Sequence, residues 1–341
     1  MKRKEFIKNT AMVSTSFFIM KDLFAKPKGP IFGHHNMRYT MDTKWGQLNP
    51  LKNPVNDCHE MVQDKKGRIL LLTNETKNNV LIYNKSGKLI NSWGHEFPGG
   101  HGLTLANEGN QESLFITDTD RHQVFKTTLD GKILMTIDCP METGLYHKKE
   151  EFVPTEVAVA DNGDFYIADG YGLQYVLHYN ASGKLLDYFG GKGSEMKHLD
   201  NAHGVTIDKR GGKPTLLVTD RTRNCFKRFD MAGNLMEVIA LPGACVCRPV
   251  IKNDYLYAAV LRSPDLNKNG SGFVTILDKD NKVISNIGGT APLYTNGVLQ
   301  PMSQAAQILL NPHDVCIDDD ENLYVAQWAS GKVYPYKFTR V

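Results

Sequence analysis

The fold is indicated by the stretch Asn201-Ala202-His203-Gly204-Val205-Thr206-Ile207-Asp208, because variants of it recur along the chain. Each copy has a histidine or a substitute, then a small or acidic residue, and then the alternating apolar residues that are typical of a strand. The other copies begin with Cys58-His59-Glu60, His101-Gly102-Leu103, Pro154-Thr155-Glu156 and Pro312-His313-Asp314. Further apolar runs and a Gly-centred turn, such as Ala181-Ser182-Gly183-Lys184, follow these copies.

The spacing of the copies predicts the architecture. His59, His101, Thr155 and His203 lie 42, 54 and 48 residues apart, and this period with four short strands per unit is typical of a β-propeller blade. We therefore expect an all-β chain folded as a six-bladed β-propeller. The blades are predicted at about 54–96, 101–142, 153–192, 202–241, 245–289 and 311–341.

The last predicted blade contains only about three strands of its own. Residues 37–46 near the N-terminus can supply its missing outer strand. Closing the ring in this way would remove open sheet edges, which otherwise invite aggregation. We expect a propeller over residues 29–341, closed by an N-terminal strand.

Residues 1–28 differ from the rest and are predicted to be an export signal. Basic residues precede a small, apolar run from Thr10 to Met20, which is the order found in signal peptides. Arg3-Lys4-Glu5-Phe6-Ile7-Lys8 resembles the twin-arginine motif with Lys4 in place of the second arginine. The alternative is an amphipathic N-terminal tail. We expect the protein to be exported, to the periplasm or the extracellular space.

The bulk composition narrows the classes of partner. The formal net charge is only +3 and no basic block or aromatic-basic stripe occurs, so we expect no nucleic-acid partner. The N-terminal apolar run is too short to predict stable membrane insertion. We expect a monomer that acts on a small-molecule or peptide-derived substrate.

Most of the six cysteines lie in predicted strands, which favours small buried side chains over disulfides.

Four histidines occupy the same position in four different blades: His59, His101, His203 and His313. The innermost strands of a propeller run along a central channel, so these side chains should converge there. Three neutral imidazoles and an open fourth position are what a catalytic Zn²⁺ requires. The alternative is that each histidine caps a strand end and bonds to the backbone.

The order of the motifs resembles that of NHL-repeat propellers and, within them, of the peptidyl-α-hydroxyglycine α-amidating lyases. The resemblance is carried by short motifs in successive blades over roughly residues 54–341. These motifs are His101-Gly102-Leu103-Thr104 with Thr117-Asp118, Pro154-Thr155-Glu156-Val157 with Asp169-Gly170-Tyr171, Ala202-His203-Gly204 with Thr219-Asp220-Arg221, and Pro312-His313-Asp314-Val315.

The resemblance to these lyases implies a set of site residues. Zinc would be bound by His101, His203 and His313, and His59 would be a fourth ligand or a substrate contact. Ca²⁺ would be bound by Asp314 with the backbone carbonyls of Leu103 and Cys58, and would tie blades together. Alternatively, Asp314 is a carboxylate that bonds the local backbone.

Tyr171 and Arg221 each follow an Asp at the end of a second strand and should overhang the channel mouth. A tyrosine near a cation can act as a general base, and an arginine can hold a carboxylate through two parallel N–H bonds. The resemblance implies that Tyr171 takes the proton of the substrate hydroxyl and that Arg221 is its partner. The implied reaction cleaves an N-acyl-α-hydroxyglycine to an amide and glyoxylate.

The sequence departs from the lyase pattern at three places. Asn74 stands where these enzymes have an arginine, Asn311 replaces a methionine, and Gly172 replaces a cysteine of a disulfide. Arg121 and Arg248 are candidates to replace the missing arginine as substrate contacts. Two other functions stay open: a non-enzymatic module that binds protein or glycan, and a single-cation lactone or ester hydrolase, which would require Glu, Asn and Asp ligands.

Overall fold

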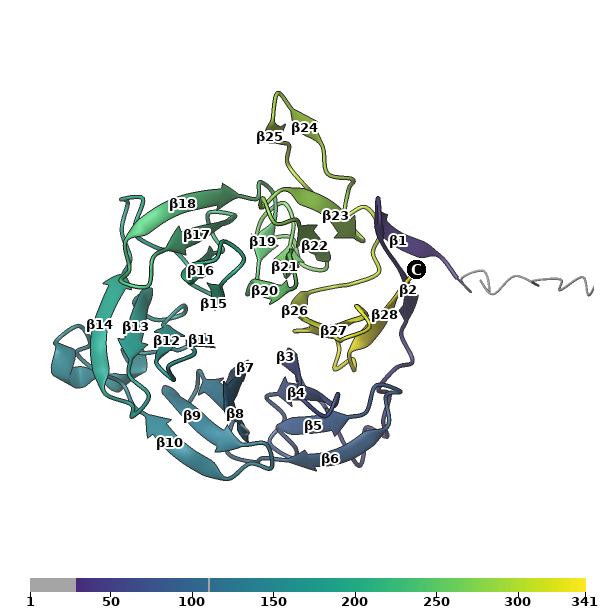
Figure 1. The fold of residues 1–341 in the computed structure, drawn as a ribbon. Helices are drawn as coiled ribbons and strands as arrows, with labels where there is room; N and C mark the ends of the chain where they lie inside the picture. The colour runs from purple at the N-terminus through teal and green to yellow at the C-terminus, as the bar shows by residue number, and fades with distance from the viewer. Residues whose placement is uncertain (1–28, 110) are drawn as a thin grey trace, which may run out of the picture.

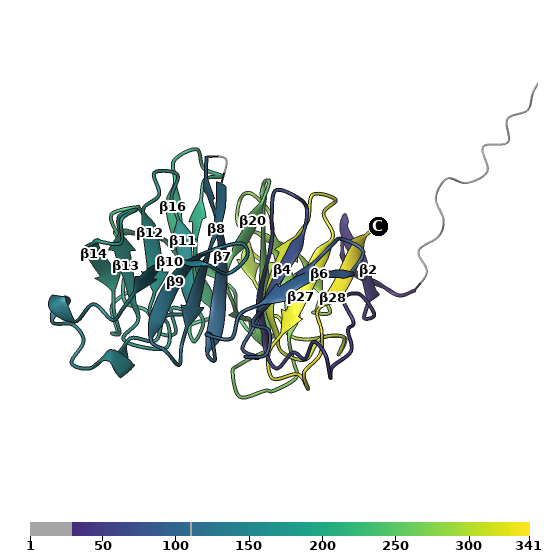
Figure 2. The same ribbon diagram turned by 90° about the horizontal axis from the view of Figure 1, so that it is seen from below.

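Six antiparallel sheets surround a central channel in the computed structural model, which describes residues 29–109 and 111–341. Figure 1 looks along this channel, and Figure 2 shows the ring from its side. The prediction of a six-bladed, all-β propeller is confirmed. The predicted export signal at 1–28 lies outside the described residues.

The first four blades each contain four strands, which follow one another from the channel outward (Figure 1). The first blade consists of β3 (Cys58–Gln63), β4 (Ile69–Thr73), β5 (Val80–Tyr83) and β6 (Leu89–Trp93). The second consists of β7 (Gly100–Glu108), β8 (Gln111–Asp118), β9 (Gln123–Thr128) and β10 (Ile133–Ile137). The third consists of β11 (Glu156–Val159), β12 (Phe165–Ala168), β13 (Tyr175–Tyr179) and β14 (Leu185–Gly190). The fourth consists of β15 (Val205–Asp208), β16 (Thr215–Asp220), β17 (Cys225–Phe229) and β18 (Leu235–Ala240).

The fifth blade is irregular on its channel side. Its inner strand is interrupted, and both pieces pair with the same second strand. The strands are β19 (Cys245–Val246), β20 (Val250–Lys252), β21 (Tyr255–Arg262), β22 (Phe273–Leu277) and β23 (Val283–Ile287). The interruption falls at Cys247, Arg248 and Pro249. Cys247 still donates its backbone N–H to the carbonyl of Ala259 on β21 at 2.8 Å, whereas Arg248 and Pro249 make no bond to that strand among the described residues. A separate hairpin, β24 (Tyr294–Thr295) and β25 (Val298–Leu299), projects from the ring (Figure 1).

The sixth blade is built from both ends of the described chain. Its inner strands are β26 (Pro312–Ile317), β27 (Leu323–Gln327) and β28 (Tyr336–Arg340). β2 (Met37–Asp42) pairs antiparallel with β28, and β1 (Ile31–His34) pairs with β2 (Figure 1). The predicted closure by an N-terminal strand is therefore confirmed, with β1 as an additional outermost strand.

The hydrophobic core is divided among the spaces between successive blades. Leu72 and Val80 of the first blade pack with Leu103 and Ile116 of the second, and five comparable clusters fill the remaining spaces. Each fully buried side chain of this kind contributes about 1.5–3 kcal/mol. The core therefore leaves the channel free for polar side chains.

Short helices occur only in one connection of the described residues. η1 (Met141–Thr143) and η2 (Lys149–Glu151) are 3-10 turns between the second and third blades. Across the described ranges, no helix has the length and apolar character needed to cross a bilayer.

Candidate metal centre

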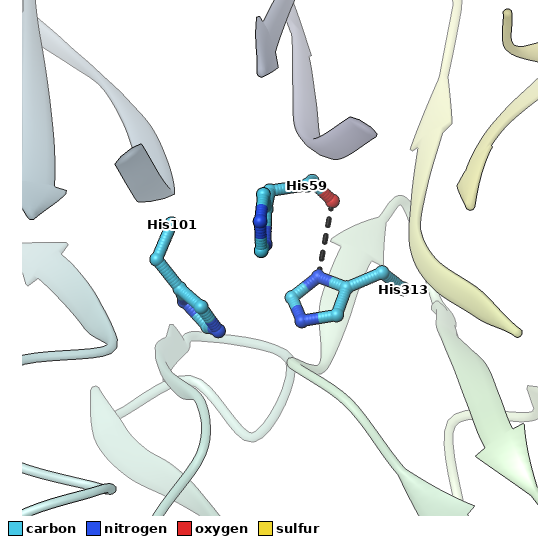
Figure 3. A group of neighbouring side chains, drawn as sticks. All are labelled: His59, His101 and His313. Carbon is cyan, nitrogen blue, oxygen red and sulfur yellow. Dashed lines mark hydrogen bonds between the residues drawn. The ribbon is translucent and has the colours of Figure 1, made fainter. Parts of the chain in front are cut away.

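The four histidines of the repeated motif meet in the channel. His59 lies on β3, His101 on β7 and His313 on β26, while His203 directly precedes Gly204 and β15. Each is at most 6% exposed, and five of the six ring pairs have centroids 4.7–4.9 Å apart. Figure 3 shows three of these rings gathered around one point. The structure therefore brings together side chains that are up to 254 residues apart in the chain.

The glycine of the His-Gly motif explains how the inner strands approach so closely. A Cβ on Gly102 would lie 2.5 Å from the carbonyl oxygen of Thr155, in the next blade. A Cβ on Gly204 would lie 2.4 Å from the Cα of Arg248. Real Cβ atoms do not approach that closely, so only glycine lets these strands converge and bring their histidines together.

Backbone carbonyls orient two of the rings. Nδ1 of His101 is 2.9 Å from the carbonyl oxygen of Thr155, and Nδ1 of His313 is 3.1 Å from that of His59 (Figure 3). A carbonyl accepts a hydrogen bond, so each Nδ1 carries the proton and each Nε2 presents its lone pair. This is the arrangement that metal-binding histidines adopt.

The Nε2 atoms of His203 and His313 lie only 3.1 Å apart. Two lone pairs at this distance repel unless a proton or a cation lies between them. Nitrogens bound to one tetrahedral Zn²⁺ at about 2.0–2.1 Å are themselves about 3.3 Å apart. His59, His101 and His313 also offer ligand atoms that all lie within 4.8 Å of one another.

All four imidazoles are held neutral. Burial lowers the pKa of His59 to about 3. Burial also lowers the pKa of His101, His203 and His313, and repulsion from neighbouring histidines and Arg221 adds to the effect. Nδ1 of His59 and of His203 are buried and have no hydrogen-bond partner among the described residues. Neutral, partly unpartnered imidazoles fit a zinc-type cation, which requires deprotonated nitrogen ligands.

Tyr171 and Arg221 lie beside the histidines. The Tyr171 hydroxyl is 3.2 Å from Nε2 of His101 and 3.5 Å from Nη1 of Arg221. Burial of this hydroxyl raises the pKa of Tyr171, and the Arg221 charge opposes that shift. The residue as a whole is 43% exposed, although its ring packs against that of His101 with centroids 5.1 Å apart.

Arg221 is itself buried and fixed by the interrupted strand of the fifth blade. Its Nε donates to the carbonyl of Val246 at 3.1 Å, and Nη2 lies 3.1 Å from Sγ of Cys247. With the bond to Tyr171, these contacts use three of the five guanidinium N–H groups. The other two N–H groups have no partner among the described hydrogen bonds.

A pocket of about 340 Å³ opens over two of the four histidines, His59 and His101. Its lining combines His59, His101 and Tyr171 with Asn74, Asp120 and Trp328. Sequence reasoning missed Trp328 and Asp120 as site residues. A signal for Trp328 was present, because it follows β27 as Tyr171 and Arg221 follow β12 and β16. Asn74 and Thr119, which follow the second strands β4 and β8, line the same pocket.

The two arginines predicted as substrate contacts have other partners. Arg121 donates to the carbonyl of Glu96 at 3.0 Å and lies over the Phe125 ring, outside the residues that line the pocket. Arg248 points along the channel away from the pocket, toward Glu60, Glu156 and Asp314. Neither replaces the missing arginine in this arrangement. Asn74 bonds to Asn56 and Asp57.

The residues predicted to bind calcium do not fit that ion. Asp314 and the Leu103 carbonyl do meet, but the guanidinium of Arg248 lies between them. The second carbonyl at this point belongs to Met61, and Cys58 is not among the partners of Arg248. A guanidinium that already occupies these oxygens would repel Ca²⁺, so the calcium prediction is corrected here.

No family model matches the chain. The sequence is 40% identical over 111 residues to peptidyl-alpha-hydroxyglycine alpha-amidating lyase 1 of Drosophila melanogaster, a match that covers 31% of this chain and 19% of the relative. It is 26% identical over 158 residues to NHL repeat-containing protein 3 of Homo sapiens, covering 44% and 45% of the two chains. The matched region thus spans less than half of each relative. The resemblance to NHL-repeat proteins and amidating lyases is confirmed.

Solved structures support the fold. A streptogramin B lyase superposes with a TM-score of 0.57 and 13% sequence identity, covering 88% of this chain and 97% of that one. At this level of identity the likeness concerns the propeller architecture.

Proposed function

We propose that the protein is a metal-dependent lyase that cleaves a carbon–nitrogen bond in a small, peptide-derived substrate bearing a hydroxyl group. The observation that carries this proposal is the meeting of four buried, neutral histidines from four blades, with two Nε2 atoms 3.1 Å apart. Tyr171 and Arg221 beside them supply a proton acceptor and a cation. The partial matches to amidating lyases support the same chemistry.

The metal would be held by His101, His203 and His313, with His59 as a fourth ligand or a contact to the substrate. The donor set of neutral imidazoles suits Zn²⁺. When bound, such a cation polarises a coordinated oxygen and lowers its pKa.

The chain's own residues then have separate roles. Arg221 uses its two available N–H groups to hold the substrate carboxylate. The Tyr171 oxygen takes the proton of the substrate hydroxyl, and the positive charges of Arg221 and of a nearby cation favour the phenolate that this requires. The Tyr171 oxygen lies 3.2 Å from Nε2 of His101, a proposed metal ligand, so the phenol is held beside the position of the metal.

In the proposed reaction, an N-acyl-α-hydroxyglycine is split into two products. The hydroxyl loses its proton, its carbon–oxygen bond becomes a carbonyl, and the carbon–nitrogen bond breaks. The electron pair of that bond goes to nitrogen, which takes a proton to become the amide. The other product is glyoxylate. Because Asn74 replaces an arginine, the site has one carboxylate contact fewer than the lyase pattern, so a substrate other than a glycolate-terminated peptide is the alternative.

Metal analysis of protein purified without a histidine tag tests the centre. We expect about one zinc per chain, lost in His203→Ala and retained in His178→Ala, a matched control on β13 beside Asp164. His59→Ala distinguishes a fourth ligand, which loses affinity for metal, from a substrate contact, which raises KM only. Protein without bound metal after zinc is supplied would contradict the enzyme and favour a binding module.

Release of glyoxylate from a hydroxyglycine-capped peptide tests the chemistry. We expect turnover by the zinc-loaded protein and none by protein treated with a chelator. A zinc-loaded sample that yields no glyoxylate would exclude this substrate class.

We also propose that the protein acts outside the cytoplasm, on the strength of the basic-then-apolar order of residues 1–28. Fractionation of cells that express the full chain tests this proposal. Recovery of the full-length protein in the cytoplasm alone would contradict it.

A further inference from the structure

A single guanidinium lies in the channel beneath the histidines. Arg248 is 8% exposed and sits in the break between β19 and β20, where Pro249 cannot donate to the ladder. Nε and Nη2 bond the two carboxylate oxygens of Asp314, both at 2.9 Å. Nη1 donates to the carbonyl of Leu103 at 2.9 Å, and Nη2 to that of Met61 at 3.0 Å. Nη1 also lies 3.0 Å from Oε2 of Glu60.

These five contacts match the five N–H groups of an arginine, so the guanidinium is fully satisfied. Each of the four channel histidines has a near neighbour in the chain that meets Arg248. The contacts are Glu60 after His59, Leu103 two residues after His101, Gly204 after His203, and Asp314 after His313. The guanidinium and backbone of Arg248 thus form the common support of four blades.

The surroundings of Arg248 resemble the ligand set of a hard cation. Three buried carboxylates, Glu60, Glu156 and Asp314, and two carbonyls supply oxygen from four strands. Oxygen ligands of this kind select Ca²⁺ when no protein cation is present. Here the planar fork of an arginine provides the positive charge and binds in fixed directions.

We propose that Arg248 is a built-in cation that positions the metal-binding histidines and makes a structural divalent ion unnecessary. It acts through the strands, since its guanidinium contacts no histidine side chain among the described bonds. The link to metal affinity rests on the proposed function, whereas the replacement of a divalent ion does not.

The variant Arg248→Ala tests whether Arg248 takes the place of a structural divalent ion. The variant keeps the carboxylates and carbonyls, and a cavity of about 290 Å³ lined by Arg248, Thr104 and Thr206 gives added ions a path to them. We expect Ca²⁺ at millimolar concentration to raise the melting temperature of Arg248→Ala and to leave that of the wild type unchanged. We also expect affinity for Co²⁺, read from its visible spectrum at the histidines, to fall about 10- to 100-fold and to recover with Ca²⁺.

Arg210→Ala is the matched control. Arg210 has a side chain only 6% exposed, bonds Asp208 and crosses to the carbonyl of Asp278 in the next blade, but touches no residue beside a histidine. The Arg210→Ala protein should have a lower melting temperature than the wild type. Ca²⁺ should not raise this temperature, and the affinity of the histidines for Co²⁺ should be unchanged. Arg248→Lys keeps the charge and loses the fork, so its Co²⁺ affinity should lie between those of the wild type and Arg248→Ala.

Calcium titration of the wild type tests the proposed role of Arg248 even if both variants fail to fold. Micromolar Ca²⁺ binding by the wild type, or a Ca²⁺ response in Arg210→Ala equal to that in Arg248→Ala, would overturn the inference. So would unchanged Co²⁺ affinity in a folded Arg248→Ala. If the wild type binds no metal at its histidines, the proposed function fails, and the calcium response of Arg248→Ala still tests Arg248.

Discussion

At the scale of single residues, the channel depends on which groups are charged. The four histidines are neutral because burial and mutual repulsion lower their pKa. Below them, Arg248 meets three carboxylates, and burial raises the pKa of Glu60 well above its usual range. The upper layer is therefore suited to a soft or borderline metal, and the lower layer to a fixed cation.

Tyr171→Phe should reduce turnover with little effect on folding. The change removes only the hydroxyl that contacts His101 and Arg221, and the ring is already partly exposed. General-base catalysis contributes about 10²–10⁴-fold, so we expect kcat to fall by that factor. Tyr188→Phe, at a residue 40% exposed on β14, is the control and should leave kcat unchanged. Equal loss in both variants would contradict a proton-transfer role for Tyr171.

Acid should destabilise the metal-free protein through its histidines. Their pKa is lower in the folded state than the usual 6.5, so the unfolded chain binds more protons as pH falls below 6.5. Each contributes up to about 1.4 kcal/mol per pH unit. Three carboxyl groups act in the opposite direction, because burial raises the pKa of Asp169 to about 7 and also raises the pKa of Glu60 and Asp118, but they are fewer than the four histidines.

Urea unfolding in EDTA at several pH values measures this effect. We expect stability to fall between pH 6.5 and 4.5 and to vary less above pH 7. His59→Asn should have a shallower dependence than the wild type. A stability that rises on acidification would contradict neutral, buried histidines.

Among the strands, two irregularities distinguish this ring from a set of regular blades. The break between β19 and β20 frees Arg248 from the ladder and lets it reach along the channel. The pairing of β2 with β28 joins the two ends of the described chain and closes the ring. Regular four-stranded blades would provide neither feature.

Removing the closing strands should cost several kcal/mol. A chain without residues 1–42 loses Met37 and Tyr39, which are 1% and 0% exposed, and leaves β28 with a free edge. Burial of these two side chains alone contributes roughly 3–6 kcal/mol. The melting temperature of this truncation should drop well below that of a chain lacking residues 1–28. Equal melting temperatures would show that the ring does not depend on β1 and β2.

At the scale of the whole molecule, stability is distributed around the ring. Six apolar clusters lie between neighbouring blades, and no cysteine pair links them. All six cysteines are free and buried, as their place in predicted strands indicated. The fold therefore rests on packing and on ring closure.

Thiol reagents should not react with the native protein. We expect slow labelling of the six cysteines under native conditions and labelling of all six after denaturation, because each is at most 9% exposed. Reducing agent should leave the melting temperature unchanged. A drop in melting temperature on reduction would indicate a disulfide and contradict the assignment of all six cysteines as free.

The number of blades, the N-terminal closure and the shared position of the four histidines could all be predicted from the amino-acid sequence. These features follow from local patterns that repeat, since alternating apolar residues and turn glycines specify the same strands in every blade. The positions after the second strands also identified Tyr171 and Arg221, which the structure places beside the histidines.

Only the tertiary structure decided what lies in the channel around the histidines. In the folded chain Arg121 lies over the Phe125 ring, Trp328 lines the pocket, and Arg248 occupies the position where calcium was expected. The direction of a side chain at a strand end or in a strand break depends on neighbours from other blades, far away in the chain. A repeat fold makes its strands predictable one by one, but the contents of its channel depend on all blades at once.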